Sequence, residues 1–212
     1  MLEQNQNYQL WLDNTIKEHV KQGKRPSLLL HACCAPCSSY VLEYLNEYFD
    51  ITLLFFNPNI SPKEEHDKRQ RELHRLVSDM GLDNVSFETA DYTPELFEKM
   101  AHGLEELDEG GERCKKCYRL RLEQTAKIAK LGGFDYFTTT LSISPYKNAR
   151  WLCAIGEELA AEYGVDYLFS DFKKRGGYKR SCELSEKYGL YRQDFCGCIY
   201  SKLAREKRIK NS

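Results

Sequence analysis

Three cysteines lie within five residues of this sequence, at Cys33, Cys34 and Cys37. They follow the apolar run of residues 27–30, which predicts a buried strand, and Pro36 predicts the first residue of a helix. The N–H groups and the dipole at a helix N-terminus favour the thiolate form of a nearby cysteine. Because thiolates bind metals and attack electrophiles, this segment predicts a metal-binding or reactive site.

The other six of the nine cysteines comprise two close pairs and two single residues. Cys114 and Cys117 form a CxxC pair at the expected start of a helix. Cys196 and Cys198 form a CxC pair around a glycine. The single residues, which we interpret as small packing side chains, are Cys153 and Cys182.

The N-terminal residues lack the basic and apolar regions of a signal peptide, and no apolar run is long enough to predict a transmembrane helix. We therefore expect a cytoplasmic protein with no membrane partner. In that reducing compartment, clustered cysteines bind metal or carry out redox chemistry more often than they form structural disulfides.

Two pairs of thiolates are enough to hold zinc or an iron–sulfur cluster. Cys33, Cys34, Cys114 and Cys117 form such a set. Adjacent cysteines are unusual in structural zinc sites, which favours a cluster and leaves zinc as the alternative.

The CxC pair suits a different task, because two thiols around one glycine can close a strained and easily reduced disulfide. A dithiol passes two electrons, whereas an ordinary cluster passes one at a time. Cys196 and Cys198 beside a cluster therefore indicate a reductase. The alternative is that both residues are further metal ligands.

Strands that alternate with helices predict one α/β domain, with a parallel sheet covered by helices on both faces. The expected strands are residues 27–32, 51–56, 85–89, 134–141 and 165–169. The expected helices are residues 8–22, 36–49, 63–80, 114–131 and 148–163, with a further helix that begins at Pro94. Residues 1–26 form an N-terminal helical extension, and residues 27–201 form the core. Ligands bind such sheets at the carboxyl ends of the strands, where Cys33 and Cys34 lie.

Positive charge is concentrated locally in a chain whose formal net charge is −1. A loop at residues 173–180 contains five basic residues, and the tail at residues 202–210 is also basic. Such segments fit a phosphate backbone, with a solvated surface as the alternative. His66 and His74 fall in a highly charged helix, and we expect both to be solvated. No nucleotide-binding loop motif is present.

Five motifs occur in a fixed order along residues 27–201, and together they resemble the epoxyqueuosine reductase QueH family. The motifs are His31-Ala32-Cys33-Cys34-Ala35-Pro36, Phe56-Asn57-Pro58-Asn59-Ile60, Glu112-Arg113-Cys114-Lys115-Lys116-Cys117-Tyr118, Thr139-Thr140-Leu141-Ser142-Ile143-Ser144-Pro145-Tyr146-Lys147-Asn148 and Tyr191-Arg192-Gln193-Asp194-Phe195-Cys196-Gly197-Cys198.

The resemblance implies a Rossmann-like fold and the last step of queuosine synthesis. In that step the epoxide of epoxyqueuosine, at the wobble base of a tRNA, is reduced to the cyclopentene with release of water. It also implies an iron–sulfur protein that needs no cobalamin and takes electrons from an unidentified donor. The residues that match ligands of a [4Fe–4S] cluster are Cys33, Cys34, Cys114 and Cys117. Those that match the redox-active pair are Cys196 and Cys198.

The resemblance does not require a cysteine at Cys37, so this residue is either an additional ligand, for example to a second iron, or a bystander. Opening the epoxide also needs protons, and the candidate donors are Asp171, Asp194 and Tyr191. Two functions of other classes compete with the reductase. One is a zinc-stabilised tRNA-binding module, and the other is a thiol–disulfide oxidoreductase that acts on proteins through the CxC pair.

Overall fold

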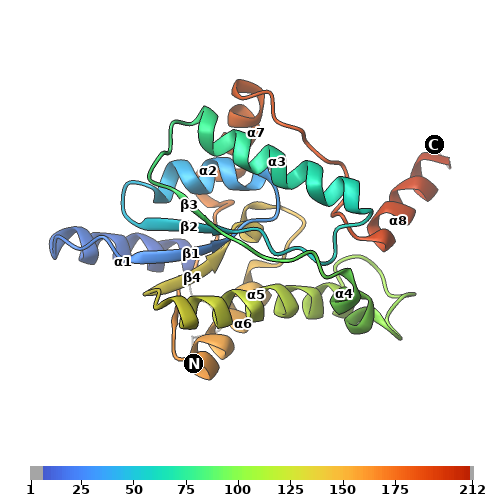
Figure 1. The fold of residues 1–212 in the computed structure, drawn as a ribbon, viewed down its shortest axis with the longest axis horizontal. Helices are drawn as coiled ribbons and strands as arrows, with labels where there is room; N and C mark the ends of the chain where they lie inside the picture. The colour runs from blue at the N-terminus through green and yellow to red at the C-terminus, as the bar shows by residue number, and fades with distance from the viewer. Residues whose placement is uncertain (1–6, 211–212) are drawn as a thin grey trace.

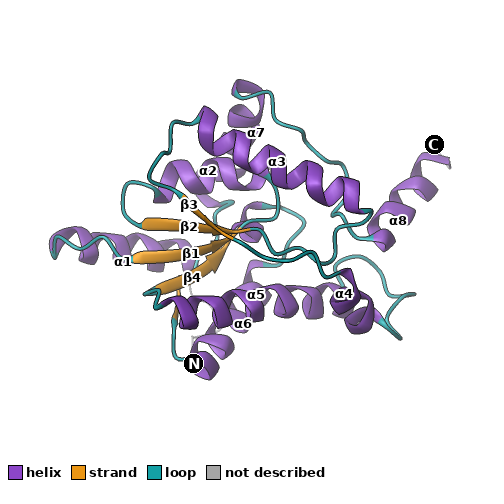
Figure 2. Ribbon diagram, viewed as in Figure 1, coloured by secondary structure: helices purple, strands orange, loops and turns teal. Residues whose placement is uncertain are grey.

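Five parallel strands form one sheet at the centre of the molecule, whose residues 7–210 are described by a computed structural model (Figures 1 and 2). The strands are β1 (Ser27–His31), β2 (Asp50–Leu54), β3 (Ser86–Glu88), β4 (Tyr136–Thr139) and β5 (Asp166–Tyr167). They lie in the order β3-β2-β1-β4-β5, and all neighbouring pairs are parallel. The predicted α/β class with a parallel sheet is therefore confirmed.

Helices cover both faces of the sheet (Figure 1). The α-helices are α1 (Tyr8–Lys21), α2 (Ala35–Leu45), α3 (Lys63–Asp79), α4 (Pro94–Ala101), α5 (Glu112–Gly132), α6 (Ala149–Tyr163), α7 (Gly177–Lys187) and α8 (Ile199–Lys210). Helices α2, α3 and α7 lie over one face, and α5 and α6 lie over the other (Figure 2). Along residues 7–210, no helix is both long and apolar enough to cross a membrane.

Alternate side chains of β1 enter two different core layers, because successive residues of a strand point to opposite faces of its sheet. Leu28 and Leu30 pack with the apolar residues of α2 and α3, and Leu29 packs with those of α5 and α6. Helix α1 adds Leu12 and Ile16 to the layer of α2 and α3. Burial on both faces holds β1 rigidly at the centre of the fold.

The order of the strands reverses at β1 and β4, which places a ligand-binding crevice at the carboxyl ends of these two strands. His31 ends β1 and is fully buried there. Its Nε2–H donates to the Phe56 carbonyl at 3.0 Å, and its Nδ1 accepts from the Thr139 hydroxyl at 2.9 Å. Burial lowers the pKa of His31 to about 4, so the ring is neutral near pH 7. His31 thus ties together the segments that carry the site.

Helix α7 was not expected from the sequence, so the prediction of a loop over residues 173–180 is wrong for its second half. A short turn of 3-10 helix, Lys174–Gly176, comes first, and α7 then begins at Gly177. Gly176 adopts the left-handed conformation with φ of 77°, which breaks the chain between the two helical segments. Gly176 and Gly177 together are typical of a turn, so the sequence does not indicate that a helix begins at this point.

His66 corrects a second expectation, since it is buried and not solvated. Its ring packs against Phe55 and Tyr92, with ring centroids 5.0 and 4.3 Å away. His74 is exposed, as predicted, although its ring stacks on Phe87. Helix α3 therefore buries more of its polar residues than its charged composition indicates.

Candidate active site

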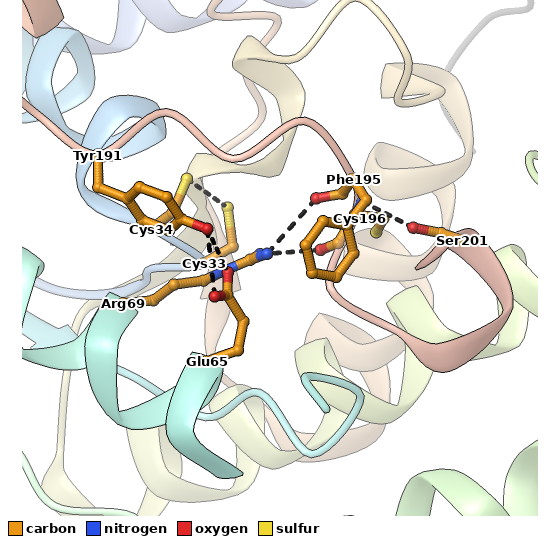
Figure 3. A network of polar contacts seen from close by, with 8 residues as sticks. All are labelled: Cys33, Cys34, Glu65, Arg69, Tyr191, Phe195, Cys196 and Ser201. Carbon is orange, nitrogen blue, oxygen red and sulfur yellow. Dashed lines mark hydrogen bonds and ion pairs between the residues drawn. The ribbon is translucent and has the colours of Figure 1, made fainter. Parts of the chain in front are cut away.

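Cys33, Cys34 and Cys37 lie together where β1 passes into α2. Their sulfur atoms lie within 4.8 Å of one another, and residues 7–210 contain no other group of three such ligand side chains. The sulfurs of Cys33 and Cys34 are 3.7 Å apart (Figure 3). Two thiolates on one tetrahedral ion lie about 3.8 Å apart when each metal–sulfur bond is about 2.3 Å. The three thiols could therefore hold a metal.

The start of α2 brings these cysteines together. Cys34 is the residue before the helix and has extended backbone, and Pro36 is the second helical residue, not the first as predicted. Cys37 lies three residues after Cys34, a spacing that returns it to the same side of the helix. The thiols of Cys34 and Cys37 lower the pKa of Cys33 well below its ordinary value. Hydrogen bonding to Cys33 raises the pKa of Cys34 to about 12, so the negative charge of the group is concentrated on Cys33.

Cys114 and Cys117 lie in the first two turns of α5, outside the group of Cys33, Cys34 and Cys37. The sulfur of Cys114 accepts the backbone N–H of Gly110 at 3.3 Å. Burial raises the pKa of Cys117, which packs in a small apolar cluster. The buried members of this cluster are Phe97, Ala101, Cys117 and Cys198. The CxxC pair is thus a direct neighbour of the CxC pair.

Arg69 of α3 holds the loop that carries the CxC pair (Figure 3). Its side chain is 2% exposed. Its Nη1 donates to the Cys196 carbonyl at 3.0 Å, and its Nε donates to Glu65 at 2.7 Å. Gly197 has φ of +120°, and a Cβ there would lie 2.9 Å from Arg69 Nη1. Only glycine can therefore separate the two cysteines while Arg69 keeps this position.

The two cysteines of the CxC pair have different surroundings. The sulfur of Cys196 accepts a hydrogen bond from Lys147 Nζ at 3.2 Å. Burial lowers the pKa of Lys147, but its interactions with the Cys196 sulfur and the Tyr118 hydroxyl outweigh burial and raise that pKa above its ordinary value. Burial, together with Cys196, raises the pKa of Cys198 to about 12. The pair is therefore asymmetric, with Cys196 facing a cation and Cys198 kept as a buried thiol.

One cavity of about 670 Å³ lies between the group of Cys33, Cys34 and Cys37 and the CxC pair, and we name it the cysteine cavity. Cys33, Cys37 and Cys196 line it directly. Gly110 and Ser201 also line it, and their backbone N–H groups contact the sulfurs of Cys114 and Cys198. Cysteines from two distant parts of the sequence thus line one space beside the carboxyl edge of the sheet, and the CxxC pair lies next to that space through the contact of Cys114 with Gly110.

The two single cysteines do not line the cysteine cavity. Cys153 is fully buried in the core layer of α5 and α6, with its sulfur 3.6 Å from the Ser170 carbonyl. Cys182 is partly exposed on α7. Cys153 therefore has the surroundings that its predicted packing role requires.

The three candidate proton donors are separated by the structure. Asp194 lines the cysteine cavity and pairs with Arg205. Tyr191 instead donates its hydroxyl to Glu65 at 3.2 Å (Figure 3). Asp171 lines a separate pocket. Of these three residues, only Asp194 reaches the cavity.

Most of the charge in the basic segment 173–180 is already balanced by neighbouring carboxylates. Lys173 lies 2.7 Å from Asp171, and Arg175 pairs with Asp13. Arg180 of α7 bridges Glu43 and Glu183. For these three cations, the ion pairs favour a place on the protein surface over a role in gripping phosphates.

Three cations around the cysteine cavity were not anticipated from the sequence: the buried Arg69 and Arg121, and the partly buried Lys147. Lys147 stands in one of the five motifs quoted above, so that signal was available. Arg69 and Arg121 stand in highly charged helices, where no pattern separates them from their solvent-facing neighbours.

The comparison with known protein families decides what this site belongs to. A family model described as epoxyqueuosine reductase QueH matches residues 28–204. The chain belongs to the epoxyqueuosine reductase QueH family. The resemblance expected from the five motifs is therefore confirmed, and the QueH match contains all nine cysteines.

Curated relatives that carry the name epoxyqueuosine reductase QueH are similar to nearly the whole chain. The protein of Streptococcus pyogenes serotype M1 is 44% identical over 198 residues, which cover 92% of this chain and 78% of that protein. The Staphylococcus epidermidis protein is 43% identical over 96% of this chain and 87% of its own length. The QueH protein of Thermotoga maritima is 35% identical over 86% of this chain and 93% of its own length.

Proposed function

We propose that this QueH family member reduces epoxyqueuosine at the wobble position of tRNA to queuosine, the last step of queuosine biosynthesis. The observation that carries the proposal is the cysteine cavity, which gathers a metal-binding group and a dithiol around one space. The names of the relatives support the same activity. The protein would act on tRNA in the cytoplasm, with electrons from a donor still to be identified.

The donor set suits an iron–sulfur cofactor, because soft thiolates are the usual ligands of such clusters. We assign Cys33, Cys34, Cys114 and Cys117 as ligands of a [4Fe–4S] cluster, with no cobalamin. Cys33 and Cys114 both pack against the core layer of α5 and α6, which supports this assignment. The position of Cys37 within the 4.8 Å group supports it as an additional ligand, for example to a second iron. When bound, such a cofactor supplies single electrons and Lewis-acidic iron.

The reaction needs two electrons and two protons, because both C–O bonds of the epoxide break to leave an alkene and water. Oxidation of Cys196 and Cys198 from dithiol to disulfide releases two electrons and two protons, so the overall step is balanced. The external donor then reduces the disulfide again. Lys147 orients the Cys196 sulfur, and Asp194 is one of two carboxyl groups, with Glu109, that line the cavity and can pass a proton to the departing oxygen.

Anaerobic purification tests the proposal. We expect a coloured protein that contains iron and acid-labile sulfide and converts epoxyqueuosine-containing tRNA to queuosine-containing tRNA when a strong reductant is supplied. Full occupancy by zinc with no iron after anaerobic reconstitution would instead indicate a zinc-stabilised tRNA-binding module. Reduction of protein disulfides with no dependence on tRNA would indicate a thiol–disulfide oxidoreductase.

A further inference from the structure

The cysteine cavity holds buried polar atoms that have no hydrogen-bond partner among residues 7–210. They include Asn59 Oδ1, Gln193 Oε1 and Arg121 Nη2. The side chains of Asn59 and Arg121 are 2% and 1% exposed. A buried polar group without a protein partner needs a water molecule or a ligand to satisfy it, so a cavity that gathers several is suited to a polar ligand.

These three side chains come from separate elements, and neighbouring contacts fix each element. The loop of Asn59 is held through the two residues that follow it. Tyr92 donates to the Ile60 carbonyl at 2.8 Å, and Ser61 N–H donates to the Gly197 carbonyl at 2.9 Å. Arg121 is held by its Nε, which lies 3.3 Å from the Cys117 carbonyl. Gln193 precedes the Phe195 and Cys196 carbonyls that Arg69 anchors. The three side chains therefore stay apart, and their residues line the same cavity.

Asn57 also has an unpartnered oxygen in this cavity, but its amide already has a structural role. Its Nδ2 donates to the Ala32 carbonyl at 2.8 Å, which fixes the loop after β2 to the end of β1. We therefore leave Asn57 out of the ligand-binding set.

The chemistry of the unpartnered atoms defines what can bind. The amide oxygens of Asn59 and Gln193 are acceptors and need O–H or N–H groups. Metal-bound thiolates and inorganic sulfide carry no hydrogen to donate, so the cofactor and its ligand cysteines cannot satisfy these oxygens. Arg121 is a cationic donor that lies near Cys33, Cys117 and Cys196, and an oxygen is a stronger acceptor for it than these sulfurs. The matching ligand is a small group that offers two hydrogen-bond donors beside an acceptor oxygen.

We propose that Asn59, Gln193 and Arg121 bind the hydroxylated epoxide ring of the substrate, an assignment that rests on the proposed function. Two ring hydroxyls donate to Asn59 Oδ1 and Gln193 Oε1, and the epoxide oxygen accepts from Arg121 Nη2. Asn59 and Gln193 are then specificity-determining residues for the ring. Arg121 recognises the epoxide oxygen, in the cavity that Cys33 and Cys196 line.

Binding of three forms of one tRNA to the anaerobically purified protein tests this assignment. One tRNA carries the 7-aminomethyl-deazaguanine base without the ring, one carries the ring with its epoxide, and one carries the ring as the alkene product. For the unmodified sequence we expect tighter binding of both ring-bearing forms than of the form without the ring, and tighter binding of the epoxide than of the alkene. Asn59→Leu and Gln193→Met should each reduce this preference about five- to tenfold, because each removes one hydrogen bond from a substrate hydroxyl.

Arg121→Lys should act differently. The alkene product has lost the epoxide oxygen, so this variant should lose the preference for epoxide over alkene and keep the preference for a ring. Asn84→Leu, which changes an exposed asparagine outside the cavity, is the matched control and should bind all three tRNAs as the unmodified protein does. Iron and sulfide contents, measured on every variant, report whether the site is still assembled.

The assignment is wrong if Asn59→Leu and Gln193→Met retain their iron and also retain the full preference for ring-bearing tRNA. Equal loss of affinity for all three tRNAs would likewise overturn it, because that result would assign these residues to the base or the backbone. Failure of the proposed function looks different. In that case the unmodified protein itself would bind the three tRNAs equally and convert none of them.

Discussion

Arg69 Nη1 donates to the carbonyl of Cys196 at 3.0 Å, across a separation of 127 residues in the sequence. Six residues further along α3, Arg75 donates in the same way to the carbonyls of Tyr188 and Gly189. Two arginines of one helix thus anchor the C-terminal segment. Arg69 holds this segment at the CxC pair, and Arg75 holds it at Tyr188 and Gly189, before that pair.

Substitution of Arg69 should therefore impair the dithiol more than substitution of Arg75. Arg69→Gln removes a buried donor from the Cys196 carbonyl, at a cost of about 1–3 kcal/mol in folding free energy. We expect the rate of disulfide formation between Cys196 and Cys198 to fall at least about tenfold, which corresponds to roughly 1.4 kcal/mol. Alkylation of the remaining free thiols measures this rate. Arg75→Gln is the matched control, and equal effects of both variants would show that Arg69 acts only on stability.

The CxC pair should be needed for turnover and not for the cofactor. The double variant Cys196→Ser/Cys198→Ser should keep its iron, sulfide and visible spectrum and should fail to convert epoxyqueuosine-containing tRNA. Each single variant should fail as well, because one thiol cannot form the disulfide that releases two electrons. Loss of iron from the double variant would indicate that Cys196 and Cys198 are metal ligands.

Cys37 should hold metal that is separate from the cluster. Cys37→Ser should lower the iron content with no loss of acid-labile sulfide, whereas Cys114→Ser should lower both, because only the second removes a proposed cluster ligand. Cys182→Ser is the control, since Cys182 lies on α7 and does not line the cysteine cavity. Unchanged iron in Cys37→Ser would make Cys37 a bystander.

His66 should make folding stability depend on pH. Burial lowers the pKa of His66 below its ordinary value of 6.5, so the unfolded chain binds a proton more readily than the folded chain. The contribution of the neutral His66 ring to the free energy of unfolding is therefore complete above about pH 6.5 and is lost as the pH falls below that value. Denaturant unfolding at a series of pH values should show a shallower decline for His66→Gln than for the unmodified chain. His102→Gln, at an exposed position, should leave the decline unchanged.

The ion-paired cations of the basic segment should contribute little to tRNA binding. Neutralising Lys173 and Arg175 should leave the salt dependence of tRNA affinity unchanged, because their charges are balanced by Asp171 and Asp13. Neutralising the exposed Lys174 and Lys179 should make the slope shallower by about one unit for each phosphate that the protein no longer neutralises. A shallower slope for the variant with Lys173 and Arg175 neutralised would indicate that the whole segment 173–180 binds phosphates.

Local patterns in the sequence were sufficient for the order of the strands, for the helices up to α6 and for the cysteine groups, but not for α7 and α8. An apolar run such as residues 27–30 marks a buried strand wherever the chain folds, and Pro36 marks a nearby helix start, because both depend on neighbours in the sequence. The parallel sheet follows from the alternation of these elements. The position of Cys33 and Cys34 at its carboxyl edge follows in turn. These features required no knowledge of distant contacts.

Only the tertiary structure decided which distant groups meet. Cys198 packs in one cluster with Cys117 of α5, and Arg69 of α3 holds the loop that carries Cys198, although the sequence separates these residues widely. His66 and Arg69 look like surface residues in a charged helix, and the partners that bury them lie in other segments. Whether such a side chain is buried depends on what packs over its helix, and that contact is absent from the local pattern of charge and hydrophobicity.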